Sequence, residues 1–164
     1  MNTLRLRKAR WLFGTFLLAV GLSPHASSQN KVTSYVNPFV GTAGHGHTYP
    51  GPSVPFGMVQ LSPDTRMEGW DACGGYHYSD NSIIGFSHTH FSGTGVPDYG
   101  DILIVPTTGP LAIDKGKPDR PETGYRSRFR HETEVATPGY YSVLLDDYGI
   151  RAELTTSARV GVHR

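Results

Sequence analysis

Two histidine pairs are the residues of this sequence whose types and spacing could do chemistry. His45 and His47 form the stretch HGH, and His88 and His90 form the stretch HTH. On a β-strand, side chains two residues apart point to the same face. Each pair could therefore offer two imidazoles to zinc or another transition metal. The alternative is that these histidines, which lie among glycines, hydrogen-bond loop backbone or line a polar pocket.

The residues that follow HTH do not complete a familiar metal-binding motif. In cupins, which also use H-x-H, a glutamate follows the second histidine by four or five positions, whereas here His90 is followed by FSGTGVPD. A small cupin-like metalloprotein that uses HGH and HTH therefore stays the less favoured hypothesis. We expect these histidines to line a pocket without a metal ion.

Hydrolysis of a glycosidic bond would need two carboxyl groups, one on either side of the bond. The candidates in this part of the chain are Asp64, Asp71, Asp80, Asp98 and Asp101. Their spacing singles out no pair, and aspartates in stretches rich in glycine and proline commonly make turns. No G-x-S-x-G frame surrounds a serine either. The sequence therefore predicts no catalytic residue.

Trp70 stands in MEGWDACGGYHY, among polar and small residues rather than in an apolar run. Its indole could stack on a sugar ring, or it could fold back onto the core. Aromatic residues nearby favour a carbohydrate pocket: Tyr49, Tyr76, Tyr78 and Tyr99. Cys73 is the only cysteine, which excludes an internal disulfide, and we expect it to be buried as a small hydrophobic residue.

The first 28 residues have the organisation of a secretory signal peptide. Basic residues precede the apolar run WLFGTFLLAVGL, and small residues follow it. The run is short for a membrane span, so we place cleavage between Ala26 and Gln29 and assign residues 29–164 to one domain. We expect an exported protein, periplasmic or secreted, with no membrane segment after cleavage.

Removal of this leader makes the charge balance acidic. The whole chain has 15 basic and 14 acidic residues. The leader holds four basic residues and no acidic one, which leaves 11 against 14 and a net charge of −3 with neutral histidine. Binding of nucleic acid needs a basic surface, so this class of function is excluded.

The rest of the chain has the pattern of an all-β domain. Glycine and proline crowd residues 33–110, which predicts successive turns. The second half alternates apolar and polar residues, which predicts antiparallel strands with one buried face. The expected strands lie in 54–61, 82–86, 101–106, 125–131, 140–145, 150–154 and 158–164, with a turn at 146–149. We expect an antiparallel β-sandwich with long Gly/Pro-rich loops.

The last seven residues, ARVGVHR, alternate as a strand does and stop without a turn or a polar tail. A strand that stops in this way leaves an unpaired edge. We therefore expect the domain to be incomplete at its C-terminal end and the chain to be a fragment of a longer protein.

Five stretches, in this order, resemble the N-terminal domain of glycoside hydrolase family 92: YVNPFVGTAGHGHTYPG, VPFGMVQLSPDTR, GWDACGGYHYSD, GFSHTHFSGTG and DYGDILIVPTTG. The resemblance runs from about Tyr35 to Arg164. Members of the family are exported, calcium-dependent exo-α-mannosidases, in which a β-sandwich precedes a larger (α/α)6 barrel. The resemblance implies an active site between these two parts.

In that family the barrel supplies the general acid, the general base and most calcium ligands. The resemblance therefore implies an intact protein that removes terminal mannose with inversion, with Ca²⁺ held mainly by the barrel, and a chain that is inactive alone. Its partners would be mannose-containing glycans and its own (α/α)6 barrel. A non-catalytic carbohydrate-binding or structural β-sandwich is the alternative from another class.

The resemblance also implies that the wall of the sandwich facing the barrel helps to form the mannose pocket. Trp70 matches a family tryptophan at the substrate pocket. Some members specific for α-1,2 linkages have a second tryptophan where this chain has Leu61, so linkage preference does not carry over. Imidazoles and carboxylates can bind sugar hydroxyls, and the further candidates are His88, His90, Asp98, His45 and His47.

Overall fold

The protein is described by a computed structural model, which covers residues 32–164. Its strands are β1 (Ser62–Asp64), β2 (Ser82–Ile83), β3 (Gly85–Ser87), β4 (Ser127–Arg128), β5 (Val135–Thr137), β6 (Tyr140–Leu145), β7 (Ile150–Thr156) and β8 (Gly161–His163). The 3-10 turns are η1 (Val32–Tyr35), η2 (Trp70–Ala72), η3 (Pro121–Thr123) and η4 (His131–Thr133). Residues 32–164 form no α-helix, which confirms the all-β prediction. The leader expected over residues 1–28 lies outside the described residues.

The most regular part is a four-stranded antiparallel sheet in the order β5-β6-β7-β8. β6 pairs with β7 along its whole length, and the turn expected at 146–149 joins the two strands. The apolar residues that alternate along these strands share one buried face. They are Tyr141, Val143, Leu145, Ala152 and Leu154. The period-two prediction for this hairpin is therefore confirmed.

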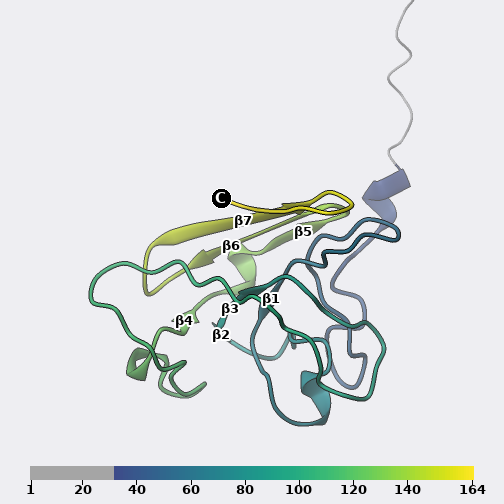
Figure 1. Ribbon diagram of the computed structural model, residues 1–164. Helices are drawn as coiled ribbons and strands as arrows, with labels where there is room; N and C mark the ends of the chain where they lie inside the picture. Colours follow the sequence, from purple (N-terminus) through teal and green to yellow (C-terminus); the bar gives the residue numbers. More distant parts are fainter. Residues whose placement is uncertain (1–31) are drawn as a thin grey trace, which may run out of the picture.

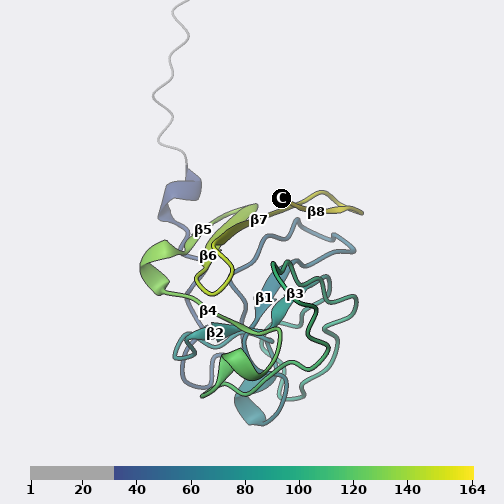
Figure 2. The same cartoon turned by 90° about the vertical axis from the view of Figure 1, so that its left-hand side faces the viewer.

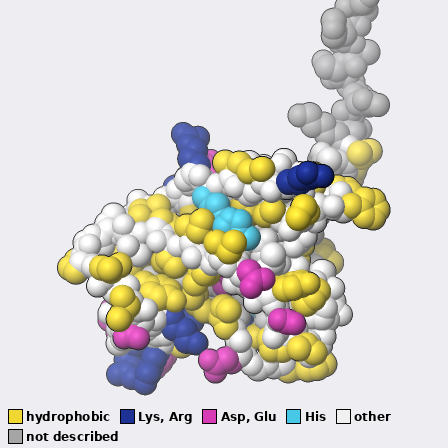
Figure 3. All heavy atoms as spheres, in the orientation of Figure 1, with side chains coloured by type: hydrophobic (Ala, Val, Ile, Leu, Met, Phe, Trp, Pro, Cys, Tyr) yellow, Lys and Arg dark blue, Asp and Glu magenta, His cyan; other side chains and the backbone are white. Residues whose placement is uncertain are grey.

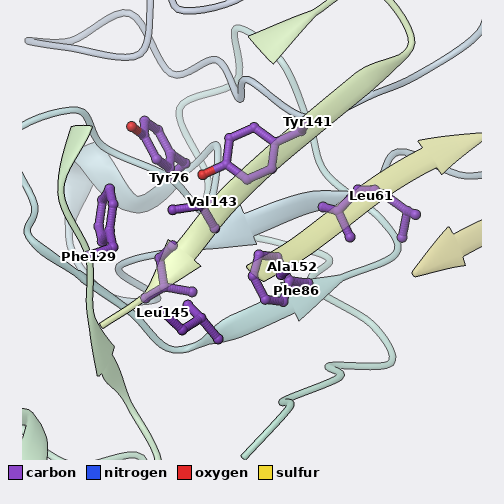
Figure 4. Close-up of a cluster of buried hydrophobic side chains, with 10 residues drawn as sticks. Leu61, Tyr76, Phe86, Phe129, Tyr141, Val143, Leu145 and Ala152 are labelled. Atoms are coloured by element: carbon purple, nitrogen blue, oxygen red, sulfur yellow. The ribbon is translucent and has the colours of Figure 1, made fainter. Parts of the chain in front are cut away.

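A second layer contains two separate antiparallel ladders, β1 with β3 and β2 with β4. Figures 1 and 2 show the four-stranded sheet above these ladders, with long loops making up the rest of the lower layer. The core lies between the layers (Figure 4), where the buried face of the sheet meets Leu61, Tyr76, Ile83, Phe86 and Phe129. Burial of these side chains is the main favourable contribution to the fold.

A buried carboxylate ties the sheet to the lower layer. The Glu134 side chain is only 1% exposed. It accepts hydrogen bonds from the phenols of Tyr76 and Tyr141 and contacts Nδ1 of His131. Burial, followed by the charge of Glu134, raises the pKa of Tyr76 and of Tyr141. Both phenols therefore stay protonated and act as donors, so the polar groups in this part of the core are paired.

The prediction of a strand over residues 54–61 is wrong. The chain turns at Phe56, which has a φ of +58° and is fully exposed. Within this run only Gln60 forms an isolated bridge, to Ser53. A positive φ is strained for a bulky residue and ends regular pairing, and an apolar run does not reveal it.

The prediction of a strand over residues 101–106 is also wrong. Ile102 has a φ of +55°, and only Ile104 forms an isolated bridge, to Phe86. The strand expected over residues 125–131 is shorter in the structure, where only β4 is extended and η4 follows it. The strand expected over 158–164 is also shorter and consists of β8 alone. The edge strand β5 was not expected, because Val135–Thr137 has no apolar alternation of its own and forms by pairing with β6.

Candidate functional site

Loops of the lower layer bring one histidine pair next to an aspartate. Nδ1 of His45 lies 2.7 Å from Oδ1 of Asp71, and Nε2 of His47 lies 3.3 Å from the same oxygen. Nδ1 of His47 contacts the carbonyl of Thr94 at 2.6 Å. The His45 hydrogen bond is the largest cause of a lowered pKa of Asp71. The site thus joins three loops, 41–50, 69–75 and 88–100, which together are called the site wall below.

The glycine between the two histidines allows this loop to close. A side chain at Gly46 would place its Cβ 2.1 Å from the carbonyl oxygen of Gly41, so no other residue fits without a backbone shift. His47 itself has a φ of +53°, which is uncommon outside glycine and is found at functional sites. The glycine of HGH is therefore needed for the loop backbone to close, and the closed loop positions the two imidazoles.

Trp70 starts the short turn η2 and presents its indole to the surface. The residue is 60% exposed. Its ring meets the His47 ring edge-on, with centroids 5.0 Å apart, and its tip rests over Gly95, where a Cβ would come within 2.8 Å. The indole is thus held at its edge and leaves apolar surface free. Of the two fates considered for Trp70, the structure shows the exposed one.

His90 is held far from solvent by three partners. Its side chain is 2% exposed and that of Asp64 is 1% exposed. Nδ1 lies 2.7 Å from the carbonyl of Gln60, while Nε2 lies 2.8 Å from Oδ1 of Asp64 and 3.1 Å from Oγ of Ser87. A neutral imidazole has one N–H, so it can donate either to the Gln60 carbonyl or to the Asp64 carboxylate, but not to both. The geometry is therefore that of a buried, hydrogen-bonded histidine–aspartate pair.

His88 lies at a bend after β3 and belongs to a different surface from His90. Its Nδ1 donates to the carbonyl of Ile102 at 2.8 Å, and its Nε2 lies 3.2 Å from Nε2 of His163 in β8. Burial, followed by the charge of His88, lowers the pKa of His163. The expectation that HTH lies on a strand and presents both rings to one side is therefore wrong.

Asp98 is one of the residues that line a small pocket. The pocket is lined by Asp64, Cys73, Gly75, His90, Asp98 and Tyr99, among others. Asp98 is exposed and caps the backbone N–H of Tyr99 at 2.8 Å. Tyr99 has a φ of +71° and stacks on Phe91 with centroids 4.0 Å apart. Cys73 is buried, as expected, and its thiol contacts the carbonyl of Trp70 at 2.8 Å.

The six sequence candidates therefore fall into three groups. His45 and Trp70 lie at the surface with Asp71, and the buried His47 contacts both Trp70 and Asp71. His90 and Asp98 share the small pocket, and His88 pairs with His163 near β8. Sequence reasoning counted Asp71 among five aspartates without selecting it and did not consider His163. The position of Asp71 directly after Trp70 was the one signal that could have selected it.

Metal ligands do not gather as the two H-x-H motifs suggest. Within residues 32–164, one group of three or more His, Cys, Asp or Glu side chains can reach a common ion, and it is His45, His47 and Asp71. Four imidazoles therefore do not share a site. This donor set is also unsuited to Ca²⁺, which takes six to eight oxygen ligands. No calcium chemistry is therefore assigned to these residues.

Apolar side chains are exposed within the site wall or next to it in sequence, at Val40, Val96 and Ile102, and also on other loops of the domain. Figure 3 shows hydrophobic groups scattered over the face that lies in view below the sheet, with histidine atoms among them. The residues exposed by half or more include Val40, Phe56, Met58, Val96, Ile102, Leu111 and Ile113. None of the helices in the described part of the chain has the length and apolar character of a membrane span.

Comparison with known families assigns the class of protein. Residues 35–164 match the glycosyl hydrolase family 92 N-terminal domain. The chain belongs to this family, and its all-β architecture is that of the N-terminal domain of family members.

Solved structures give particular relatives. The family GH92 α-mannosidase BT3965 from Bacteroides thetaiotaomicron, also solved with mannoimidazole, is 51% identical with a TM-score of 0.79, over 81% of this chain and 18% of that one. The family GH92 inverting mannosidase BT2199 from the same species is 35% identical with a TM-score of 0.65, over 80% and 17%. The GH92 glycosyl hydrolase ccman5 is 33% identical with a TM-score of 0.66, over 80% and 18%.

A curated relative extends the match to most of the sequence. A secreted glycosidase of Arthroderma benhamiae is 32% identical over 160 residues, which is 94% of this chain and 20% of the relative. The chain thus spans about a fifth of the length of the proteins it matches. It is similar to the N-terminal part of glycoside hydrolases.

Proposed function

We propose that this chain is the N-terminal part of an exported α-mannosidase that hydrolyses terminal α-mannosidic linkages with inversion and depends on calcium. Membership of family 92 and the similarity to α-mannosidases support the substrate class. One of the relatives is an inverting mannosidase, which supports the stereochemistry. The secreted relative supports export, in agreement with the leader expected over residues 1–28.

The observation that carries this proposal is the placement of Trp70 beside Asp71. The indole keeps most of its surface exposed while its edge is fixed by His47 and Gly95. An exposed aromatic face of this kind can stack on the apolar face of a sugar ring. Because the edge of the indole is already fixed, its side chain loses little conformational freedom when a sugar binds. Asp71 and His45 lie at the same surface and can bind hydroxyl groups.

His90 contributes to the pocket by holding its wall. Its ring and the Asp64 carboxylate are buried and engaged with each other. In this proposal His90 positions the backbone on which the binding residues stand, and Asp98 and Tyr99 also line the small pocket. His88 belongs to the neighbouring surface with His163.

The proton transfers of hydrolysis are assigned to another part of the whole protein. An inverting glycosidase needs two carboxyl groups about 6.5–9.5 Å apart. Asp64 shares the small pocket with Asp98, but it is buried and bound to His90. It is therefore unavailable as an acid or a base. We propose that the exposed apolar residues around the site wall pack against the (α/α)6 barrel that supplies the catalytic groups.

The proposal is tested by following the product formed by the full-length protein. An aryl α-mannoside is incubated with the protein in calcium-containing buffer, and the anomeric signals of released mannose are recorded by NMR before mutarotation. The proposal predicts β-mannose as the first product, and loss of activity with EDTA that Ca²⁺ restores. Release of α-mannose first, or full activity after calcium removal, contradicts the mechanism.

The alternative function is a carbohydrate-binding domain without chemistry. The observation that favours it is that residues 32–164 expose the indole of Trp70 but offer no free pair of carboxylates at the small pocket. Mannoside binding by a full-length protein that hydrolyses no α-mannoside would support this alternative and contradict the first.

A further inference from the structure

We infer that His45, His47 and Asp71 form a transition-metal site, with Zn²⁺ as the expected ion. The site differs from the four-imidazole arrangement that the two H-x-H motifs suggest, because its third ligand is the aspartate that follows Trp70. The ligand atoms of the three residues all lie within 4.8 Å of one another. The site is distinct from the calcium dependence proposed above and does not rest on the mannosidase activity.

The hydrogen bonds of His47 leave a lone pair directed at Asp71. Nδ1 of His47 lies 2.6 Å from the carbonyl oxygen of Thr94, and a carbonyl only accepts, so this nitrogen carries the proton. In the neutral ring Nε2 is then an acceptor. It lies 3.3 Å from Oδ1 of Asp71, which is also an acceptor. Two acceptors that face each other in this way can be bridged by a metal ion that both bind.

The distances of this pair suit a tetrahedral ion. Ligands at about 2.1 Å from a tetrahedral zinc are separated from one another by about 3.4 Å, and Nε2 of His47 and Oδ1 of Asp71 are 3.3 Å apart. His45 Nδ1 is closer to Asp71, at 2.7 Å, and must move outward to bind. Its side chain is 76% exposed, so this movement meets no packed neighbour on its solvent side.

The chemistry of the donors selects the metal. Two imidazole nitrogens and one carboxylate oxygen are typical ligands of Zn²⁺ and neighbouring transition metals, whereas Ca²⁺ prefers oxygen alone. The contact between Nδ1 of His47 and a backbone carbonyl is the usual outer contact of a metal-bound histidine, which fixes the ring and its tautomer. The His47 ring is also fixed at its edge by Trp70.

Three protein ligands leave one position of a tetrahedral ion open. Water or a hydroxyl group of a ligand can fill this position. The exposed indole of Trp70 lies against the His47 ring, so a polyol that stacks on Trp70 could present a hydroxyl to the ion. The site would then bind a metal with or without sugar, and binding of the metal is the property to measure.

Zinc binding is tested on the untagged full-length protein. The protein is freed of transition metals with a chelator, returned to calcium-containing buffer and titrated with ZnCl₂ by calorimetry, with bound metal counted by mass spectrometry. We expect stoichiometric zinc that is absent from Asp71→Asn and His47→Ala. Co²⁺ in place of zinc is expected to give the visible absorption of a tetrahedral site in the wild type alone.

Two further variants separate the site from a general effect on the fold. His45→Ala changes an exposed residue and is expected to weaken zinc binding at least about tenfold with an unchanged circular dichroism spectrum. The control His77→Gln alters a histidine that contacts the carbonyl of Gly44 rather than Asp71 and is expected to bind zinc as the wild type does. The inference is overturned if the wild type binds no stoichiometric zinc, or if Asp71→Asn and His45→Ala bind it with wild-type affinity.

Discussion

The four-stranded sheet and the site wall of this domain are held together in different ways. In the sheet, β6 and β7 pair along six residues and bury one apolar face. In the site wall, loops are fixed by hydrogen bonds between side chains and distant backbone, such as His47 to Thr94 and His90 to Gln60. The first region depends on apolar area removed from water, and the second depends on buried polar groups that must be paired.

This difference has a consequence for where function can lie. The sheet uses ordinary backbone conformations, whereas the site wall and the loop after it contain His47, Tyr99 and Ile102 at positive φ. Strained residues persist only where their surroundings hold them. Substitutions in the two regions should therefore differ in how strongly they change the stability of the fold.

The largest effect is expected from Asp64→Ala, which leaves the buried His90 without its carboxylate. Removing one partner of a buried ion pair costs about 3–5 kcal/mol of unfolding free energy. Chemical denaturation measures this loss, with the exposed Asp119→Ala as the matched control. A loss below about 1 kcal/mol would show that the site wall does not depend on this pair.

A loss of about 2–5 kcal/mol is expected from Leu154→Ala, and its cause is different. Leu154 is 1% exposed in β7 within the core, so its truncation removes apolar contacts and leaves a cavity. Leu111, which is 85% exposed, supplies the control Leu111→Ala, with an expected change within about 0.5 kcal/mol. Equal losses for the two leucines would mean that the assigned core is wrong.

A smaller, pH-dependent effect is expected from Asp80→Asn. Burial alone would raise the pKa of Asp80, but the hydrogen bonds from Arg66 and Thr65 outweigh it and the pKa is lowered. Such a group stabilises the fold above its unfolded pKa of about 3.9, and the contribution is lost as pH falls through the folded pKa. Because the pair is partly exposed, we expect a difference from wild type of about 0.5–1 kcal/mol at pH 7.

The pH profile is the test of this assignment. Unfolding curves of wild type and Asp80→Asn should differ at pH 7, and the difference should shrink as the pH falls below the unfolded pKa of about 3.9 and through the lowered folded pKa. A difference that stays constant from pH 7 to pH 3 would assign the effect of the substitution to lost packing instead of lost charge.

The smallest effect on stability is expected from Gly95→Val. Gly95 is exposed, but a Cβ there comes within 2.8 Å of the Trp70 ring. The indole must move out, while the unfolding free energy should change by less than about 0.5 kcal/mol. Trp70 is the only tryptophan in residues 29–164, so the intrinsic fluorescence of this part of the protein follows it, and we expect a red-shifted emission from it. Unchanged emission would place Trp70 elsewhere than over Gly95.

The sequence predicted the sheet better than the site wall for a physical reason. Alternating apolar residues and the turn at 146–149 specify a local hairpin, and residues 140–145 and 150–154 pair as expected. The runs 54–61 and 101–106 are equally apolar, but positive φ values at Phe56 and Ile102 break them. Backbone strain of this kind has no signature in hydrophobic periodicity.

The candidate site was predicted as a set of residues and not as an arrangement. Asp71 meets His45 across 26 residues of sequence, and His88 meets His163 across 75. Which of these distant residues meet depends on how loops close, and no spacing rule contains that information. The bend at His88 also separates the HTH histidines that a regular strand would have placed together.

Sugar binding at the site wall is tested by comparing Trp70→Ala with Leu154→Ala in the full-length protein, for both the unfolding free energy and kcat/KM on an α-mannoside. Truncating a tryptophan at the centre of a binding surface typically costs about 2 kcal/mol or more, which is about a 30-fold loss of kcat/KM. We predict this loss for Trp70→Ala with nearly unchanged stability, and the reverse for Leu154→Ala. If Trp70→Ala keeps wild-type kcat/KM, or loses it only by unfolding, the site wall is not where the sugar binds.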